Sequence, residues 1–381
     1  MIDIKKELPE IFDDFAEARR NSFLAVKEIK EKNIPIIGIF CTFFPQELAL
    51  AAGATSVSLC STSDETIDVA EKDLPKNLCP LIKSSYGFAI TDKCPFFYFS
   101  DLVVGETTCD GKKKMYELMG KFKRVHVMEL PNSQSKDGLK LWYNEIIKMK
   151  EYIEELFDVE ITDEKIREAI GIKNRERNAL KKFYGIMKED ELPIMGLDLW
   201  HTLYGAQFKF DKAAIPAEID QLIEKIQSEH KHITGRPRIL VTGCPIGGAT
   251  EKVISAIEDN GGIVVAYENC GGAKAIDRNV EEDTDDPYMA IAEKYLNIGC
   301  ACMSPNPNRR DLLSRMIDEY KVDGVVDMHL QTCTPFQVES TTIKNFCNEE
   351  KGIPYIAVET DYSKSDLGQL NTRLAAFVEM L

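Results

Sequence analysis

The sequence lacks the long apolar segments of membrane and exported proteins. No run approaches the ~18 apolar residues of a membrane span. The first residues, from Met1 to Glu7, are charged and do not resemble an apolar leader. Disulfides need an oxidising compartment, which a protein usually reaches by means of an apolar leader or membrane segment. We therefore expect a cytoplasmic protein with reduced cysteines and no membrane partner.

Nucleotide-binding motifs and a positive net charge are also absent. The glycines from Gly243 to Gly248 do not form Gly-x-Gly-x-x-Gly, and there is no Gly-x4-Gly-Lys-Ser/Thr motif, so we expect that this chain does not itself bind ATP. The formal net charge is −16. Because phosphate binding needs a basic surface, this charge argues against nucleic acid as a partner.

Closely paired cysteines of the structural-zinc type are missing, although the sequence contains 11 cysteines. Most of them follow apolar runs and stand beside Gly, Pro or Asp, a placement suited to soft metals and iron–sulfur clusters. The alternative is a small buried hydrophobic side chain. That alternative is favoured for Cys347 and stays open for Cys60 and Cys94.

Short apolar runs alternate with helical patterns in two parts of the chain. The runs occupy 34–40, 56–59, 101–105 and 125–128, then 238–241, 263–266, 324–328 and 354–358. Such runs are typical of buried parallel strands, and 381 residues exceed one ordinary core. The pattern predicts an α/β protein with two doubly wound parallel-sheet (Rossmann/flavodoxin-like) domains joined by a helical segment.

The expected boundaries follow from where the strand-like runs stop. Residues 1–134 form the N-terminal α/β domain, 135–235 the helical segment and 236–381 the C-terminal α/β domain. The first 32 residues are expected to be helical, from the spacing of Leu8, Ile11, Phe12, Phe15, Phe23 and Val26. Ligands of open parallel sheets bind at the carboxyl ends of the strands. Two facing domains would therefore bring their cysteines into one cleft.

Three cysteines stand at expected helix starts: Cys79 before Pro80, Cys109 before Asp110, and Cys333 before Thr334. A helix N-terminus offers unpaired N–H donors and the positive end of a dipole. We expect this environment to lower the thiol pKa and to stabilise an anionic cluster. Three thiolates would leave one iron of a 4Fe–4S cubane without a protein ligand.

These segments resemble the 2-hydroxyacyl-CoA dehydratase and benzoyl-CoA reductase family over nearly the whole chain. The resemblance is carried by four cysteine segments and the closing strand: residues 41–53, Leu78-Cys79-Pro80, Cys109-Asp110, Cys333 and 356–362. In that family the positions of Cys79, Cys109 and Cys333 look like the three ligands of the cluster. Residues 78–87 and 103–116 resemble more specifically the branch of double-cubane cluster proteins.

The resemblance implies an oxygen-sensitive reductase with a double-cubane (8Fe–9S) cluster, in which two 4Fe cubanes share a bridging sulfide and each is held by three cysteines. It implies ATP-dependent, low-potential reduction of a small-molecule substrate, with electrons from a separate iron–sulfur ATPase activator, and a homodimer. Two other functions stay open. One is a 2-hydroxyacyl-CoA dehydratase subunit with a single 4Fe–4S cluster, and the other is a non-catalytic electron carrier.

The second half carries cysteines beyond the three that one cubane needs. We expect Cys244, Cys270 and Cys300 to hold the second cubane, with Cys41 and Cys302 as alternatives. The glycines beside Cys244 and Cys270 would let the backbone approach an inorganic core.

Other polar residues near the cysteines carry weaker signals. Lys112, with Lys113 and Lys114, is expected on a solvated helix face, with neutralisation of a cluster as the alternative. A structural role is favoured for His329 over that of proton donor. Glu359 and Asp361 end the last apolar run, where they could relay protons or cap the final helix.

Overall fold

The structure, a computed structural model, describes residues 17–229, 232–244 and 247–381. The helix expected over the first 32 residues is confirmed for α2 (Ala18–Glu31), which includes Phe23 and Val26. The other residues that predicted it, Leu8, Ile11, Phe12 and Phe15, lie outside the described residues. None of the described helices is long and apolar enough to cross a membrane.

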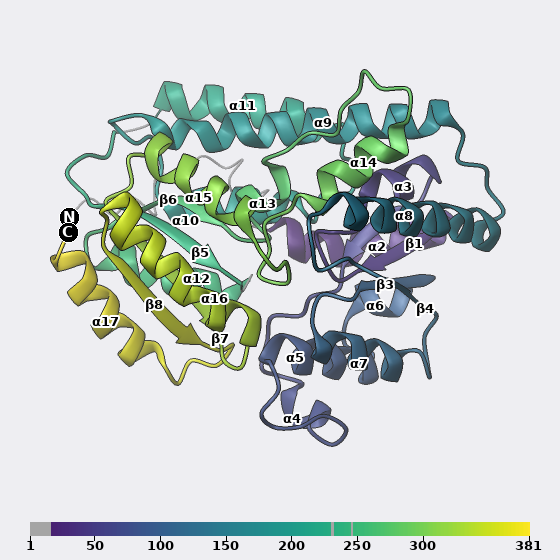
Figure 1. Cartoon of the computed structure of the whole chain (residues 1–381), viewed down its shortest axis with the longest axis horizontal. Coiled ribbons are helices and arrows are strands. Elements are labelled where there is room, and N and C mark those ends of the chain that lie inside the picture. The colour runs from purple at the N-terminus through teal and green to yellow at the C-terminus, as the bar shows by residue number, and fades with distance from the viewer. Residues whose placement is uncertain (1–16, 230–231, 245–246) are drawn as a thin grey trace.

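Two parallel sheets of four strands form the core of the two halves (Figure 1), as the sequence predicts. The strand order is β2-β1-β3-β4 in the first sheet and β6-β5-β7-β8 in the second, so both halves share one topology. The strands are β1 (Ile36–Ile39), β2 (Thr55–Ser58), β3 (Leu102–Glu106), β4 (Val125–Met128), β5 (Arg238–Gly243), β6 (Ile263–Glu268), β7 (Gly324–Leu330) and β8 (Tyr355–Thr360).

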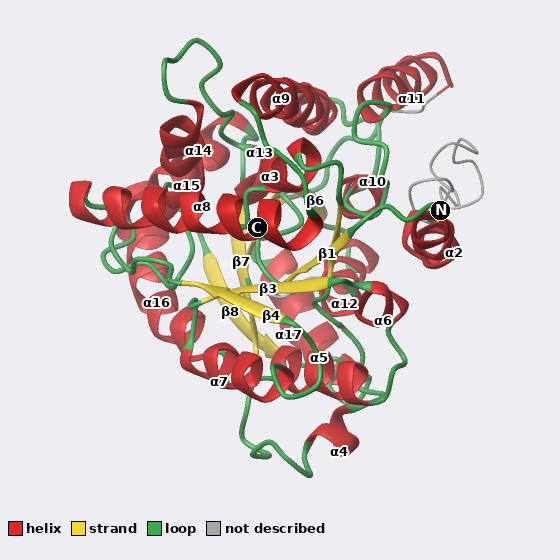
Figure 2. Cartoon of the chain, turned by 90° about the vertical axis from the view of Figure 1, so that its right-hand side faces the viewer, coloured by secondary structure: helices red, strands yellow, loops and turns green. Residues whose placement is uncertain are grey.

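Helices cover both faces of each sheet (Figure 2). In the first half they are α3 (Gln46–Ala51), α4 (Ile67–Ala70), α5 (Pro80–Ile90), α6 (Pro95–Phe99) and α7 (Asp110–Met119). In the second half they are α12 (Gly248–Asp259), α13 (Ala273–Ile276), α14 (Pro287–Leu296), α15 (Pro307–Glu319), α16 (Thr334–Asn345), a π-helical turn (Phe346–Lys351) and α17 (Leu367–Glu379). Side chains alternate along a strand, so both faces of a covered sheet must be apolar.

Alternate residues of the first sheet pack into two different clusters. Ile36 and Val103 share a core cluster with Met115 of α7. Ile37 and Leu102 pack instead with Trp142, which lies on the long helix α8 (Lys136–Phe157). All of these side chains are at most 1% exposed. Because both faces are buried, these strands are continuous apolar runs, which is why the sequence predicts them well.

The helical segment contains α8 (Lys136–Phe157), α9 (Asp163–Gly185), a 3₁₀ turn (Ile186–Lys188), α10 (Gly196–Ala206) and α11 (Ile215–Glu229). Its only pairing in the described residues is one antiparallel bridge between Leu192 and Ile233. α8 packs against α14, and α9 packs against α3 and α13, so the segment contacts both halves. The domain boundaries at 134/135 and 235/236 stay a prediction.

A buried ion pair links this segment to both halves. Arg177 of α9 lies 2.5 Å from Glu47 of α3, and Tyr295 of α14 donates a hydrogen bond of 2.7 Å to the same carboxylate. Burial opposes ionisation, but the charges of Arg177, Lys294 and Lys173 outweigh it and lower the pKa of Glu47 from 4.5 to about 2.

We expect Glu47→Gln to lower the free energy of unfolding by about 3 kcal/mol at pH 7, because it leaves a buried guanidinium without its counter-charge. The folded pKa is depressed, so the carboxylate stabilises the fold above pH 4.5 and this contribution is lost as the pH falls towards 2. Urea denaturation across this range measures the difference.

Glu65→Gln is the matched control, because Glu65 forms a 2.6 Å pair with Lys93 at an exposed site. It should change stability by less than about 1 kcal/mol. Equal effects of the two substitutions at pH 7 would contradict the role assigned to Glu47.

Candidate thiol-lined metal centre

Three cysteines occupy the N-cap positions of helices, as the sequence predicts. Cys79 precedes α5, Cys109 precedes α7 and Cys333 precedes α16. Pro80 is the first residue of α5 and Thr334-Pro335 begins α16, a placement of proline that helix starts favour because the first N–H groups lack partners anyway. The helices that begin after Cys109 and Cys333 follow strands β3 and β7.

Six cysteines stand at corresponding strand ends of the two halves. Cys41 and Cys244 follow β1 and β5, Cys60 and Cys270 follow β2 and β6, and Cys109 and Cys333 follow β3 and β7. In both sheets the first and third strands are neighbours at the point where the strand order reverses. This is where doubly wound sheets bind their ligands.

Four thiols form a first group, which we define as Cys79, Cys109, Cys244 and Cys333. The thiol of Cys333 is hydrogen-bonded to the thiols of both Cys79 and Cys244. Cys109 is close enough to Cys79 for the charge of Cys79 to raise the pKa of Cys109. The backbone N–H of Leu330 donates to the sulfur of Cys244 at 3.3 Å, which holds Cys244 beside the end of β7.

Four other thiols form a second group: Cys41, Cys270, Cys300 and Cys302. Cys300 and Cys302 are hydrogen-bonded to each other. The charges of Cys270 and Cys300 act on Cys41, and the charge of Cys41 acts on Cys302. All four thiols are therefore linked by electrostatic contact.

A cavity of about 160 Å³ is lined by members of both groups. Its lining includes Cys244 of the first group and Cys41 and Cys270 of the second, together with Cys60. Cys60 donates to the carbonyl oxygen of Phe40 at 3.1 Å, and its charge acts on Cys270. Sequence reasoning left Cys60 between packing and ligation. Cys60 follows β2 as Cys270 follows the equivalent strand β6, and this equivalence could have indicated that Cys60 lies near the other thiols. It becomes visible only once the order of both sheets is known.

The grouping differs from the expected ligand sets in one respect. Cys79, Cys109 and Cys333 lie together, and so do Cys270 and Cys300, but Cys244 lies beside Cys333 and the neighbour of Cys270 and Cys300 is Cys41. Within the described part of the chain, no three Cys, His, Asp or Glu side chains converge on one metal-ion position. A cubane takes each protein ligand at a different iron, so its thiolates surround a space and need not meet at a point.

The two remaining cysteines have structural surroundings. Cys347 is fully buried in the core, as the hydrophobic interpretation expects, and burial raises its pKa to about 12. The sulfur of Cys94 accepts a hydrogen bond of 3.5 Å from the N–H of Phe97 and so caps α6.

The expectation that helix starts give low thiol pKa values is wrong for Cys79, Cys109 and Cys333, whose pKa values are raised. The hydrogen bond with Cys333, followed by burial, raises the pKa of Cys79 well above its usual value. Burial likewise raises the pKa of Cys109. Backbone N–H groups of α5 and α7 act in the opposite direction but are outweighed. Thiols packed together in a buried place resist ionisation unless a cation is bound among them.

One thiol of the second group behaves differently. The hydrogen bond from Cys302, with the charges of Lys274 and Arg309, lowers the pKa of Cys300 to about 6 despite burial. Lys274 is 4% exposed and Arg309 is fully buried. Cys300 is therefore the one thiol of this group whose pKa is lowered, since those of Cys41, Cys270 and Cys302 are raised.

The glycines near the cysteines are explained by contacts within the protein. A Cβ at Gly243 would lie 1.9 Å from the carbonyl oxygen of Met328, and one at Gly272 would lie 2.3 Å from that of Tyr267. Gly243 also has a φ of +116°, which favours glycine. The expectation that these glycines make room for an inorganic core is therefore wrong for these two, because backbone already fills the space.

Lys112 is another correction, since it does not lie on a solvated face with Lys113 and Lys114. It is 8% exposed and donates to the carbonyl oxygen of Phe40 at 3.0 Å, and it lines the cavity. The prediction holds for Lys113 and Lys114, which pair with acidic side chains at exposed positions.

Glu106 at the end of β3 was missed by sequence reasoning. It is fully buried, and neither carboxylate oxygen has a hydrogen-bond partner among the described residues. Burial, partly opposed by the charge of Lys112, raises its pKa to about 8. A carboxyl group that keeps its proton at pH 7 can donate it to a nearby acceptor.

The other expected proton sources have structural neighbours. His329 Nε2 lies 3.0 Å from Asp327 Oδ1 in the buried part of β7. Glu359 accepts from Gln337 at 2.5 Å, and Asp361 accepts from the N–H of Ser363 at 2.8 Å in the loop before α17.

Comparison with known proteins matches residues 41–381 to the family model of the 2-hydroxyglutaryl-CoA dehydratase D-component. YjiM of Escherichia coli (strain K12), provisionally named a dehydratase subunit, is 58% identical over 98% of this chain and 99% of its own length. The (R)-phenyllactyl-CoA dehydratase beta subunit of Clostridium sporogenes is 24% identical over 97% of this chain and 98% of its own length. One of the benzoyl-CoA reductase subunits of Thauera aromatica is 18% identical over 94% of both chains.

Proposed function

The chain belongs to the family of the 2-hydroxyglutaryl-CoA dehydratase D-component, and we propose that it is an iron–sulfur reductase with a double-cubane cluster. It would reduce small molecules at low potential, with electrons from a separate iron–sulfur ATPase activator. The observation that carries the proposal is the gathering of eight thiols into two groups, which contribute Cys244 and the pair Cys41 and Cys270, respectively, to the lining of one cavity. A single cubane with three protein ligands would leave most of these thiols without a role.

Cys79, Cys109 and Cys333 are the proposed ligands of the first cubane. Cys270 and Cys300 are proposed for the second, with Cys244 as the third ligand expected from the sequence and Cys41 as its competitor. The neighbours of Cys41 favour it for the second site, whereas the hydrogen bond to Cys333 favours Cys244 as part of the first. The donor set fits such a group, because soft thiolates are the ligands that iron–sulfur clusters take.

When bound, such a cluster supplies electrons at low potential. The chain's own residues have other tasks. Lys112 and Lys274 place positive charge beside the thiols and so offset the negative charge of thiolates. Glu106, buried and facing the charge of Lys112, would hold a proton at its carboxyl group for transfer during reduction.

The proposed partners and location rest on the same family resemblance. They are the activator, a small-molecule substrate and a second copy of this chain in a homodimer, with no nucleic acid and no membrane. A cytoplasmic, reducing location suits 11 cysteines that all remain unpaired in the structure.

Two other functions remain as alternatives. Family membership supports a dehydratase subunit, and the two thiol groups support an electron carrier. A dehydratase subunit with one 4Fe–4S cluster would act on a 2-hydroxyacyl-CoA, the kind of compound in the names of several relatives. An electron carrier would use the clusters without turnover.

Turnover separates these functions. Anaerobic protein given activator, ATP and a strong reductant should reduce a small-molecule substrate and stop when ATP is withheld. Dehydration of (R)-2-hydroxyglutaryl-CoA without such a reduction would favour the dehydratase. Reversible electron uptake with neither reaction would favour the carrier.

A further inference from the structure

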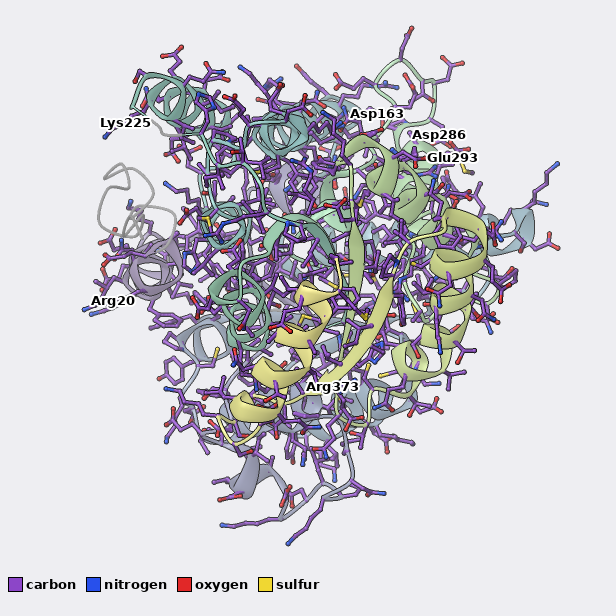
Figure 3. All side chains as sticks on the ribbon, turned by 90° about the vertical axis from the view of Figure 1, so that its left-hand side faces the viewer. Arg20, Asp163, Lys225, Asp286, Glu293 and Arg373 are labelled. Atoms are coloured by element: carbon purple, nitrogen blue, oxygen red, sulfur yellow. The ribbon has the colours of Figure 1, made fainter. Side chains whose placement is uncertain are left out.

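The cavity that Cys41, Cys244 and Cys270 line also has buried cations in its lining. Lys173 and Arg177 come from α9, Lys212 precedes α11 and Lys294 comes from α14. We call these four residues the cation pocket. Each is at most 7% exposed, in contrast to the labelled cations Arg20 and Lys225 of Figure 3, which project outward from α2 and α11.

The carboxylates around the cation pocket do not balance it. Glu176 lies 3.4 Å from Lys212 and also pairs with Lys173. Glu47 pairs with Arg177 behind the cavity wall. Four cations thus face two carboxylates, and both carboxylates are already engaged.

Lys294 is the cation of the pocket without a direct ion pair, although the charges of Glu47 and Glu176 act on it. Its ammonium group lies 3.8 Å from the centre of the Tyr295 ring and 3.5 Å from the carbonyl oxygen of Ala275. Among the described residues, no carboxylate forms an ion pair with this ammonium group. Burial, followed by the charge of Arg177, lowers its pKa well below the usual value.

Burying unpaired positive charge is costly, so a ligand with negative charge would be strongly favoured at this place. The cavity volume limits what that ligand can be. The whole cavity of about 160 Å³ lies below the ~300 Å³ at which sites for drug-sized ligands begin, and a cluster held by Cys41, Cys244 or Cys270 would take part of that space. A CoA thioester is larger than such ligands, whereas formate, acetate or nitrate is much smaller.

We propose that the cation pocket binds a small anion, a carboxylate or an oxyanion, as the substrate beside the thiol groups. The identification as substrate rests on the proposed function, whereas binding of the anion does not. Lys112 and Lys274 are the lysines that act on the thiol charges. The four cations of the pocket line the same cavity as Cys41, Cys244 and Cys270, where they can hold a ligand beside these thiols.

Thermal unfolding of the anaerobic, iron-loaded full chain tests this. Sodium formate and sodium nitrate are titrated separately at constant ionic strength, set with the bulky sulfonate MES. We expect at least one of the two to raise Tm in a saturable way, as a ligand of the folded state does. Formate alone would identify a carboxylate site, nitrate alone an oxyanion site, and both a site for small anions in general.

The variants Lys294→Met and Lys212→Met should weaken this binding about tenfold or more, because each removes a charge-assisted contact. Without added anion, Lys294→Met should unfold at the same temperature as the unaltered protein or higher, because an unpaired buried charge is gone. Lys182→Met is the matched control on α9, where Lys182 pairs with Asp220 at an exposed site. It should bind like the unaltered protein.

The absence of a saturable Tm rise with either anion would overturn the proposal, and so would an equal rise in the unaltered protein and both pocket variants. Loss of iron from both variants would also overturn it, since the cations would then serve the cluster. Iron is measured in every sample. If protein kept free of oxygen throughout purification contains no iron and still binds the anion, the proposed function is contradicted but the cation pocket is not.

Discussion

Replacing Cys109 with alanine should remove most of the iron and lower turnover by at least ~100-fold, because even residues that only support a metal ligand typically cost 10–100-fold. Cys109 is one of three proposed ligands of the first cubane, and it caps α7 at the end of β3. Cys79→Ala and Cys333→Ala should behave in the same way. Iron content and the visible spectrum of anaerobic protein measure the effect independently of activity.

Cys347→Ala is the matched control, since Cys347 is a fully buried cysteine of the core. It should keep its iron and lose about 1 kcal/mol of stability through poorer packing. Full iron and an unaltered spectrum in Cys109→Ala would mean that the first thiol group is not the cluster site.

The second set of thiols should give a partial loss. We expect Cys270→Ala and Cys300→Ala to lose about half of the iron, because each removes a ligand of the second cubane while the first keeps its own three. Turnover should be lost in both, since reduction is proposed to need the whole cluster. Iron analysis beside the unaltered protein measures the fraction that remains.

The same measurement decides between Cys41 and Cys244. If Cys41→Ala loses about half of the iron and Cys244→Ala keeps it, the third ligand of the second cubane is Cys41. The reverse result would restore the set expected from the sequence. Full iron in Cys270→Ala and Cys300→Ala alike would contradict a second cubane altogether and favour the dehydratase function.

The strands and the helix starts could be predicted because their signals are local. A buried parallel strand is an apolar run, and β4 (Val125–Met128) has the predicted limits. Cys79, Cys109 and Cys333 directly precede helices, as their neighbours Pro80, Asp110 and Thr334 indicate. The identical strand order of the two sheets was implied only in outline, as two doubly wound halves.

The grouping of the thiols could not be predicted, because it depends on how the halves face each other. Cys79 of the first half is 254 residues from Cys333 of the second in the chain, yet their thiols are hydrogen-bonded. The cation pocket was missed for a related reason. Lys173 and Arg177 belong to a highly charged helix, and only its packing against α3 and α13 buries that side. Lys112 was misjudged because a run of lysines is usually solvated.

Iron and acid-labile sulfide analysis of anaerobically purified protein tests the central claim most directly. Two thiol groups around one cavity predict about eight irons per chain, because each cubane holds four. About four irons would contradict the double cubane and leave a single-cluster dehydratase subunit. No iron in protein kept free of oxygen throughout would contradict every function proposed for these thiols.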